Sequence, residues 1–362
     1  MSKPSIAIIL PPKELYMPQY RGAVALCMTD FSRHSRYREQ TVIYGSQVMD
    51  LPDLHHATIS GWQRWYWRDS YAWSVELAKR IRQHGQTLVE VQNRPLIFGY
   101  LARMLKNEAR VSLHLHNDPQ GMKGCQSARQ RQFLLNHAAA VYCVSAYIRE
   151  RFVEGLQQGL DKVHVVHNGL DTRLFQPQTK QPLVMYAGRI IREKGALPLA
   201  EAFASIAGQV TGWNFLVCGV DRLEATSEYE RLTHGFLDEI GKQCQYTGYL
   251  DHAEVMQRFA SASIAVVPSV WQEPFGRTAL EAMAAGTALI TSGSGGIAEV
   301  VGDAALIVPP RPDALADALL KLIRNSELRQ QLQRAARLRA ESRFDIRLLA
   351  SQLDDLRDHL LV

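Results

Sequence analysis

The 362-residue chain lacks several features that would place it in a large class of proteins. It has no apolar run long enough to span a membrane as a helix, and the apolar part of its N-terminal segment, MSKPSIAIILPP, is too short for a signal peptide. Cysteine is scarce and odd in number, and no pair has the spacing of metal ligands: Cys27, Cys125, Cys143, Cys218 and Cys244. Because Cys143 and Cys218 lie in apolar runs, we expect buried thiols in a reducing compartment. The chain is therefore expected to be cytoplasmic, or peripheral on the inner face of a membrane.

The chain also lacks the common motifs for metals and tightly held cofactors. It contains no G-x-G-x-x-G dinucleotide fingerprint, no Walker lysine motif, no D-x-D pair and no H-E-x-x-H. We therefore expect no essential metal ion.

The excess of positive charge is small, since 41 Lys and Arg against 36 Asp and Glu give a net charge of +5. This is too little to argue for nucleic acid, but it suits an anionic ligand or an anionic membrane surface. The hydrophobic content of 46% excludes a disordered chain and, at this length, allows two domains with separate cores.

Short apolar runs alternate with amphipathic helical patterns along the whole chain, which is typical of parallel sheets covered by helices on both faces. The first half predicts strands at 5–10, 41–45, 87–91, 110–115, 140–144 and 163–166, with helices such as 74–83 and 146–157. After a polar linker at 168–182, strands are expected at 183–187, 214–218, 263–267, 287–291 and 305–308. Three helices, near 312–324, 326–341 and 345–361, close the chain. The prediction is an α/β protein of two doubly wound domains in series, followed by a helical tail.

The stretch WQEPFGRTALEAMAAG, which follows the strand 263–267, carries the strongest signal. Pro274 and Gly276 break the chain, and a helix begins near Arg277 or Thr278. The free amides of a helix N-terminus bind phosphate, and Glu281, one turn later, has a carboxylate that accepts bonds from a sugar diol. Glu273 lies before the turn and so reaches a group on the other side of the phosphates. The plain alternative is a carboxylate that complements the helix dipole, and a solvated Glu273.

The segment YAGRIIREKG follows the strand 183–187 and places cations at another strand end. Gly188 lets the chain turn, and Arg189 and Lys194 could neutralise a diphosphate leaving group. Basic residues are common in such loops, so a solvated pair is an equal alternative. The glycines of TSGSGGIAEVV, at 291–301, allow close approach of the backbone to a ligand or make an ordinary tight connection.

Two positions in the first half are candidates of the same kind. His116, in HLHNDPQG, follows a strand and could donate to a sugar hydroxyl or a phosphate, whereas His114 is expected to be a structural strand residue. Gly22, in YRGAVA, opens a helix where phosphate or acceptor would be contacted.

Four of the six tryptophans lie close together in GWQRWYWRDSYAW, with Arg64 and Arg68 between them. Trp62, Trp65 and Trp67 suit an anionic membrane surface. An acceptor groove and an aromatic core helix are the alternatives.

Taken in order, these motifs resemble those of a known family. EPFGRTALEAMAAGTALITSGSGGIAEVV is similar to the signature of the retaining nucleotide-sugar glycosyltransferases of family 4, the E-x7-E class with the GT-B fold. AGRIIREKG resembles their G-R-x4-K-G segment, and VVHNGLDTRLF resembles the N-G-x-D segment that joins their two domains. The ordered set covers residues 140–310, and RGAVA and HNDP are consistent with it, although Arg21 stands where the usual loop has a second glycine.

The resemblance implies two Rossmann-like domains facing across a cleft, an acceptor-binding domain at 1–170 and a nucleotide-sugar-binding domain at 171–342. The last helix, 343–362, would cross back to the first domain. It implies a metal-independent hexosyltransferase whose nucleotide-sugar donor is its co-substrate. By position, Arg189 and Lys194 would hold the diphosphate, Glu273 and His116 the donor sugar, and Glu281 the ribose hydroxyls. The remaining donor contacts would come from Gly22, Gly188, Tyr249, Leu250, Phe275, Gly276, Arg277, Thr278 and Ala279, with Tyr249 or Leu250 at the base.

The resemblance leaves the substrates open. A UDP-sugar is the expected donor and GDP-mannose the alternative. The acceptor would be a sugar or lipid-linked saccharide of envelope or exopolysaccharide synthesis, such as lipopolysaccharide, and no nucleic acid is expected. Two other functions fit the same architecture: a nucleotide-sugar epimerase and a non-catalytic nucleotide-sugar-binding protein.

Overall fold

The computed structural model describes residues 5–12, 14, 16–17, 20–45, 53–59, 70–176, 178–221 and 226–361. The chain divides into two compact units, Met1–Leu170 with Ile346–Val362, and Asp171–Asp345. The boundaries expected from the sequence are 170 and 342.

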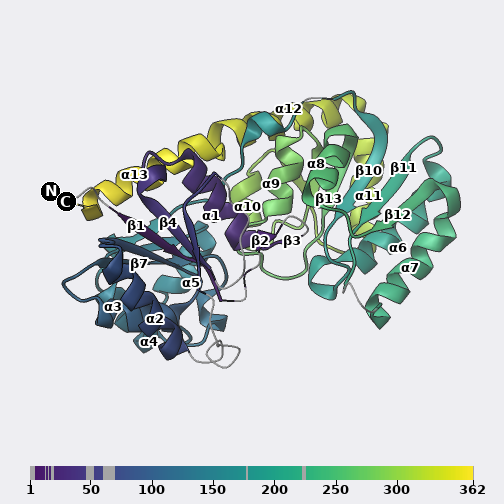
Figure 1. Ribbon diagram of the computed structural model, residues 1–362. Helices are drawn as coiled ribbons and strands as arrows, with labels where there is room; N and C mark the ends of the chain where they lie inside the picture. The colour runs from purple at the N-terminus through teal and green to yellow at the C-terminus, as the bar shows by residue number, and fades with distance from the viewer. Residues whose placement is uncertain are drawn as a thin grey trace. The chain divides into compact units, whose positions relative to one another are not determined.

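Unit 1 is built on a parallel sheet of seven strands in the order β5-β4-β1-β6-β7-β8-β9 (Figure 1). The strands are β1 (Ile6–Ile9), β4 (Thr41–Gly45), β5 (His56–Thr58), β6 (Leu88–Gln92), β7 (Arg110–Leu115), β8 (Val141–Cys143) and β9 (Val163–Val165). Its helices are α1 (Ala23–His34), α2 (Ser70–Gln83), α3 (Pro95–Met104), α4 (Ala128–His137), α5 (Ala146–Val153) and α13 (Ile346–Leu361). A short antiparallel pair, β2 (Tyr16–Met17) and β3 (Tyr20–Arg21), precedes α1.

The last helix, α13, belongs to unit 1, as the resemblance implied, and packs beside α1 (Figure 1). Its buried side chains recur at helical spacing and meet the core formed by β1, α1 and β4: Ile346, Leu349, Ala350, Leu353, Asp354 and Arg357. The stripe ends in two charged residues. Arg357 donates to both carboxylate oxygens of Glu90 on β6, at 2.8 and 2.7 Å, and to Asp354 at 2.9 Å. A buried ion pair thus fixes the end of the chain to the central strands of this sheet.

Unit 2 has a parallel sheet of six strands in the order β12-β11-β10-β13-β14-β15. The strands are β10 (Gln181–Ala187), β11 (Asn214–Cys218), β12 (Cys244–Gly248), β13 (Ala262–Val267), β14 (Ala288–Thr291) and β15 (Ala305–Ile307). The helices are α6 (Ala196–Ile206), α7 (Glu228–Ile240), α8 (His252–Ser261), α9 (Arg277–Ala284), α10 (Ile297–Val301), α11 (Pro312–Arg324) and α12 (Ser326–Arg343). All six residues of β13 are buried, which is why this strand reads as an unbroken apolar run.

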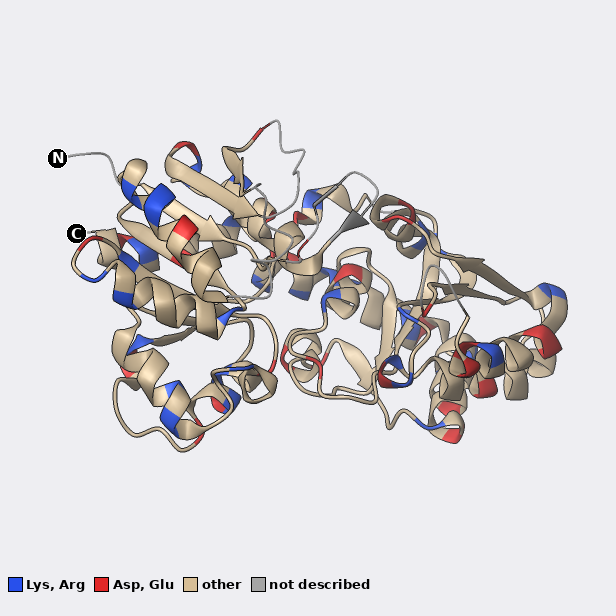
Figure 2. Cartoon of the chain, turned by 60° about the horizontal axis from the view of Figure 1, so that its bottom comes forward, with Lys and Arg blue, Asp and Glu red and all other residues tan. Residues whose placement is uncertain are grey.

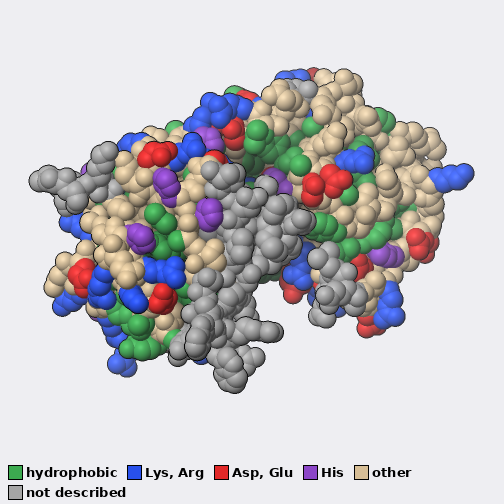
Figure 3. Space-filling view, in the orientation of Figure 1, with side chains coloured by type: hydrophobic (Ala, Val, Ile, Leu, Met, Phe, Trp, Pro, Cys, Tyr) green, Lys and Arg blue, Asp and Glu red, His purple; other side chains and the backbone are tan. Residues whose placement is uncertain are grey.

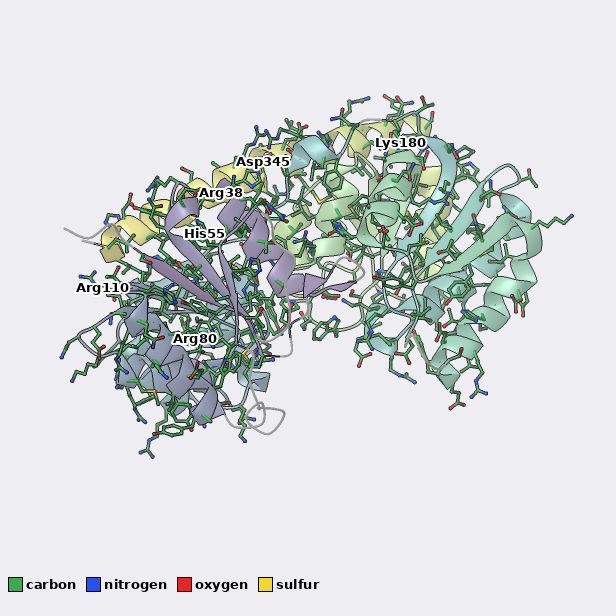
Figure 4. All side chains as sticks on the ribbon, in the orientation of Figure 1. Arg38, His55, Arg80, Arg110, Lys180 and Asp345 are labelled. Carbon is green, nitrogen blue, oxygen red and sulfur yellow. The ribbon has the colours of Figure 1, made fainter. Side chains whose placement is uncertain are left out.

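Lys180 ties the amino-terminal edge of this sheet together. Its ammonium group, labelled in Figure 4, donates to the carbonyl oxygens of Phe259, Ala260 and Ala285 at 3.3, 2.9 and 2.7 Å. Burial lowers the pKa of Lys180 to about 8. The bonds join the start of β10 to the ends of α8 and α9, and so stabilise the amino-terminal end of this sheet.

The structure confirms every strand that the sequence predicted, and adds four: the short pair β2 and β3, and the strands β5 and β12 of the two parallel sheets. β5 and β12 lie at the outer edges of their sheets, and their residues are largely exposed or half-buried. An edge strand in such a sheet need not be apolar on both faces, so it gives a weak pattern. The predicted linker at 168–182 is shorter in the structure, because β10 already begins at Gln181.

Candidate active site

The residues that the sequence singled out in unit 2 lie after β10, β12 and β13, at the carboxyl ends of these strands. β10 and β13 are neighbours in the sheet, and β12 is the edge strand two places beyond β10. The loops after parallel strands share one edge of the sheet, which is where open α/β sheets bind ligands. The structure arranges these residues in two groups.

The first group joins the loop after β10 to the loop after β13. Lys194, at the end of a single 3₁₀ turn (Arg192–Lys194), lies 2.5 Å from Oε1 of Glu273. The same carboxylate oxygen accepts a hydrogen bond of 2.7 Å from Ser269. Glu273 is 6% exposed, so its charge is compensated by an ammonium group and a hydroxyl rather than by water. We call Lys194, Ser269 and Glu273 the sugar-end cluster.

Glycines of the third motif hold the backbone around Glu273. A β-carbon at Gly295 would lie 2.4 Å from the carbonyl oxygen of Glu273, and one at Gly296 would lie 2.4 Å from that of Pro274. Gly296 also donates its amide to the Glu273 carbonyl at 2.7 Å. Of the two interpretations of this glycine-rich turn, the structure favours the tight connection, because the close approach that it permits is to the protein's own backbone.

The predicted helix N-terminus is present. Gly276 is the N-cap of α9, with a φ of 98°, and a β-carbon there would lie 2.5 Å from Ile297. The first intrahelical bond runs from the amide of Leu280 to the carbonyl of Gly276, so it does not use the amides of Arg277, Thr278 and Ala279. The N-cap residue, Gly276, has no side chain with which to cap this end. The Phe275 side chain is buried and packs edge-on against Phe344, so this residue offers a ligand its backbone alone.

The second group forms around Glu281, on the first turns of α9. Its Oε1 accepts hydrogen bonds of 2.9 Å from Arg277 and 2.9 Å from Nε2 of His252. Burial alone would raise the pKa of Glu281, but the hydrogen bond from His252 and the charge of Arg277 outweigh it and lower the pKa. The carboxylate is therefore ionised and held in place before any ligand arrives. We call Glu281, Arg277 and His252 the ribose-end cluster.

His252 was not anticipated from the sequence. It occupies the first position of α8, where Asp251 and Glu254 form a reciprocal capping box with bonds of 2.8 and 3.0 Å. The D-x-x-E spacing of DHAE was readable and fixes where α8 begins, but not that its first residue meets α9. Ser269, two residues after β13, was also not predicted, because no motif in the sequence singles it out.

The other predicted residues of unit 2 lie at the same strand ends without joining either cluster. The Arg189 side chain is 62% exposed and lies 3.4 Å from Asp221 rather than beside Lys194. Gly188 donates its amide to Cys218, and its carbonyl would lie 1.9 Å from a β-carbon at Gly219, so the two loops cross in close contact. After β12, Tyr249 is 47% exposed and Leu250 is half-buried.

In unit 1, His116 lies beyond the end of β7 and is bonded to the neighbouring strand end. Its Nε2 lies 2.9 Å from Oε1 of Gln92, and its amide donates to Oδ1 of Asn93 at 3.1 Å. Burial lowers the pKa of His116 to about 3, so the ring is neutral at physiological pH. Asn93 has a φ of 58°, an unusual backbone conformation for a residue other than glycine.

Gly22 is the N-cap of α1, as expected for a helix opening, but the first amides of that helix already have an anionic partner. Oε1 of Glu14 accepts from the amides of Val24 and Ala25 at 3.0 and 3.2 Å. A β-carbon at Gly22 would lie 2.1 Å from this oxygen, so glycine makes room for the carboxylate. The preference of this helix end for an anion is satisfied within unit 1.

The buried histidines of unit 1 predict acid sensitivity. Burial lowers the pKa of His114 to about 4 despite the nearby Glu90 carboxylate, and that of His116 to about 3. In the unfolded chain histidine has a pKa of about 6.5, so as pH falls the unfolded state takes up protons first. The free energy of unfolding should therefore decline from pH about 6.5 to about 4. Urea unfolding of the wild type and of His114→Gln at several pH values measures this decline. If the free energy of unfolding fell as steeply with pH in the variant as in the wild type, the prediction would be wrong.

Two predictions remain outside what the structure tests. Trp62, Trp65 and Trp67 lie outside the described residues, while Trp73 is buried in α2. Within the described ranges, no group of three or more His, Cys, Asp or Glu side chains is gathered to hold a metal, and no helix has the length and apolar character needed to cross a membrane. Basic and acidic residues are interspersed over both units in Figure 2.

Comparison with known proteins gives two family matches that follow one another along the chain. Residues 25–174 match the model of Glycosyltransferase Family 4, and residues 172–339 match that of the group 1 glycosyl transferases. A glycogen synthase of Mycobacterium tuberculosis is 30% identical over 227 residues, which are 60% of this chain. The matched part spans only 54% of that relative, about half its length. A lipopolysaccharide 1,2-N-acetylglucosaminetransferase of Salmonella typhimurium is 24% identical over 81% of this chain and 80% of its own.

Solved structures share the fold. Anabaena Alr3699/HepE in complex with UDP has a TM-score of 0.79 at 18% identity, covering 98% of this chain and 100% of its own. A glycosyltransferase from Rickettsia africae has a TM-score of 0.80 at 18% identity, covering 100% and 99%. At these identities the likeness shows the GT-B arrangement of two Rossmann-like sheets, and says nothing of substrates.

Proposed function

We propose that this chain, which belongs to the family-4-like glycosyltransferases of the GT-B fold, transfers a hexosyl group from a nucleotide-diphosphate sugar to an acceptor hydroxyl. The observation that carries the proposal is that the two acids of this segment lie in two separate clusters of polar side chains, the sugar-end cluster and the ribose-end cluster. Glu273, which precedes α9 in the chain, meets Lys194, and Glu281, within α9, meets Arg277 and His252. A nucleotide sugar has the matching order of groups: a sugar, a diphosphate, and a ribose with its base.

The ribose-end cluster suits a diol. Oε1 of Glu281 accepts from Arg277 and His252, which leaves Oε2 to accept hydrogen bonds from ribose hydroxyls. Since the carboxylate is ionised and fixed beforehand, little ordering is required when the ligand binds. Exposed Tyr249, at the end of the edge strand β12, suits the base beside it.

The sugar-end cluster and the α9 amides suit the reacting end. Breaking the glycosidic bond leaves an oxocarbenium-like sugar and a new negative charge on the departing diphosphate. The Lys194 ammonium and the amides of residues 277–279 would stabilise that charge more in the transition state than in the ground state. Glu273, held by Lys194 and Ser269, would accept hydrogen bonds from sugar hydroxyls.

We further propose that the reaction retains the configuration of the sugar and requires no metal, as expected from the E-x7-E motif. The donor is proposed to be a UDP-sugar, with GDP-mannose as the alternative. The acceptor is proposed to be a saccharide or glycolipid of envelope polysaccharide synthesis. The lipopolysaccharide N-acetylglucosaminetransferase that this chain resembles supports that class of acceptor.

The ribose contact gives a binding test that does not depend on knowing the acceptor. In the wild type, UDP should bind about tenfold more tightly than 2′-deoxy-UDP. The deoxy ligand lacks the 2′-hydroxyl and so leaves the buried Glu281 carboxylate without one hydrogen-bond donor. In Glu281→Gln, which keeps the shape but loses the charge, UDP should bind more weakly and most of this preference should disappear. Isothermal titration of both ligands, and of GDP with 2′-deoxy-GDP, measures the effect. Equal preference in wild type and variant would remove Glu281 from the ribose site.

A further inference from the structure

The loop after β13 exposes two large apolar side chains beside the buried Glu273. Val270 is 50% exposed and Trp271 is 41% exposed. Exposed apolar groups occur elsewhere on this protein, as the green side chains in Figure 3 show, so exposure alone does not mark a site. Trp271 differs because its backbone is fixed and charged side chains lie beside its ring.

The backbone that carries Trp271 is fixed on both sides. The amides of Val270 and Trp271 both donate to the carbonyl of Glu193, at 2.9 and 3.4 Å. Gly195 closes the contact from the other loop, since a β-carbon there would lie 2.1 Å from the carbonyl oxygen of Pro268. The indole is therefore presented by a backbone joined to the loop of Lys194, as a preorganised binding surface requires.

The indole ring lies against the sugar-end cluster. Nζ of Lys194 is 5.6 Å from the ring centroid, and the same ammonium lies 2.5 Å from Glu273. An exposed aromatic surface, a cation and a carboxylate are thus gathered within a few residues. This combination matches a pyranose ring, which has a face of C–H groups that packs on an aromatic ring and a rim of hydroxyls that bonds to charged groups.

Two other occupants fit less well. An apolar partner would not use the ion pair of Lys194 and Glu273, and would leave it desolvated. A nucleotide base would stack on an aromatic ring, but the ribose-end cluster lies between α8 and α9, where Tyr249 precedes α8. The base is thereby assigned to the β12 side, and Trp271 is left for the sugar.

Resting on the proposed function, we propose that Trp271 is the platform on which the pyranose ring of the donor sugar packs, and so helps to determine which sugar is accepted. The indole holds the C–H face of the ring while Glu273 accepts hydrogen bonds from its hydroxyls. Trp271 then contributes to the binding of the sugar and not of the nucleotide.

The test compares each nucleoside diphosphate with its own sugar derivative: UDP with UDP-glucose, and GDP with GDP-mannose. In Trp271→Leu the Kd of the sugar derivative that binds the wild type should rise about fivefold, the usual size of one aromatic contact, with the Kd of the diphosphate unchanged. Trp271→Phe, which keeps an aromatic ring, should recover part of the loss. Val270→Ala removes the neighbouring exposed side chain and should leave both Kd values unchanged.

The outcomes separate three explanations. If Trp271→Leu weakens UDP and UDP-glucose equally, the indole acts by positioning Lys194 against the diphosphate, and the platform is wrong. If neither Kd moves while thermal melts show folded variants, Trp271 has no part in donor binding, and the platform is again wrong. If the wild type binds no nucleotide or nucleotide sugar at all, the proposed function itself fails, and the platform falls with it.

Discussion

Replacement of Lys194 by methionine is expected to lower kcat by about 100- to 1,000-fold, the effect of removing one preorganised electrostatic donor from an active site. Lys194 is the cation that the structure places against Glu273, at 2.5 Å, and it is partly shielded from water. Its loss would remove charge from the departing diphosphate and would also leave the buried Glu273 carboxylate without its counter-ion. Initial rates of nucleoside diphosphate release, measured with donor and acceptor, give kcat and KM separately.

Arg189 and Arg192 supply graded controls for this prediction. The Arg189 side chain is 62% exposed and 3.4 Å from Asp221, so Arg189→Met should lower kcat less than Lys194→Met does. Arg192, on the same 3₁₀ turn as Lys194, is exposed to solvent, and Arg192→Met should leave kcat within about twofold of the wild type. If Lys194→Met retained near-normal kcat, or if Arg189→Met were the more damaging change, the assignment of Lys194 to the leaving group would be wrong.

Replacement of Arg357 by methionine is expected to destabilise the protein by about 3–5 kcal/mol, the cost of removing one partner from a buried ion pair. Arg357 is 1% exposed, and Glu90 and Asp354, which accept its hydrogen bonds, are equally buried. The variant would leave the Glu90 carboxylate within the sheet of unit 1 without a counter-ion. The free energy of unfolding, from urea titration followed by circular dichroism, measures the loss.

Two further variants separate the ion pair from a general loss of packing. Adding Glu90→Gln to Arg357→Met removes the charge of the carboxylate that Arg357 binds through two nitrogens. The double variant should therefore lose less stability than the sum of the losses of the two single variants. Arg36→Met breaks exposed ion pairs with Asp355 and Asp358 of α13, the helix that carries Arg357, and should cost no more than about 1 kcal/mol. Strict additivity of the two buried substitutions would contradict a coupled pair.

The apolar patterns were sufficient to predict most of the fold. Runs such as ASIAVV are buried over their full length because helices cover both faces of a parallel sheet, and that burial is visible as an unbroken apolar run. The same rule could not reveal β5 or β12, whose edge positions leave their residues partly exposed. It also could not explain α13 fully, because its buried stripe ends in Asp354 and Arg357, two residues that a hydrophobic pattern counts as polar.

The candidate site was predicted where a single stretch of sequence contains it. Gly276, the start of α9 and Glu281 are neighbours in the chain, and the geometry of one turn fixes their spacing. Where a side chain's partner lies in a different βα loop, the sequence around that side chain did not predict the partner. Arg189 and Lys194 were grouped because they are close in sequence, yet the structure pairs one with Asp221 and the other with Glu273.

The sequence by itself therefore determined the alternation of strands and helices, the position of the α9 N-terminus and the two acids that lie before and after it in the chain. These depend on the conformation of residues that are close together in the chain. Only the tertiary structure decided which side chains bind those acids: Lys194 and Ser269 bind Glu273, and His252 and Arg277 bind Glu281. Ser269 and Arg277 are four residues from their partners, whereas Lys194 and His252 come from other βα segments and reach the acids only when separate strands come into register in one sheet. Burial there makes compensation of each charge obligatory, but it does not specify in the sequence which residue will provide it.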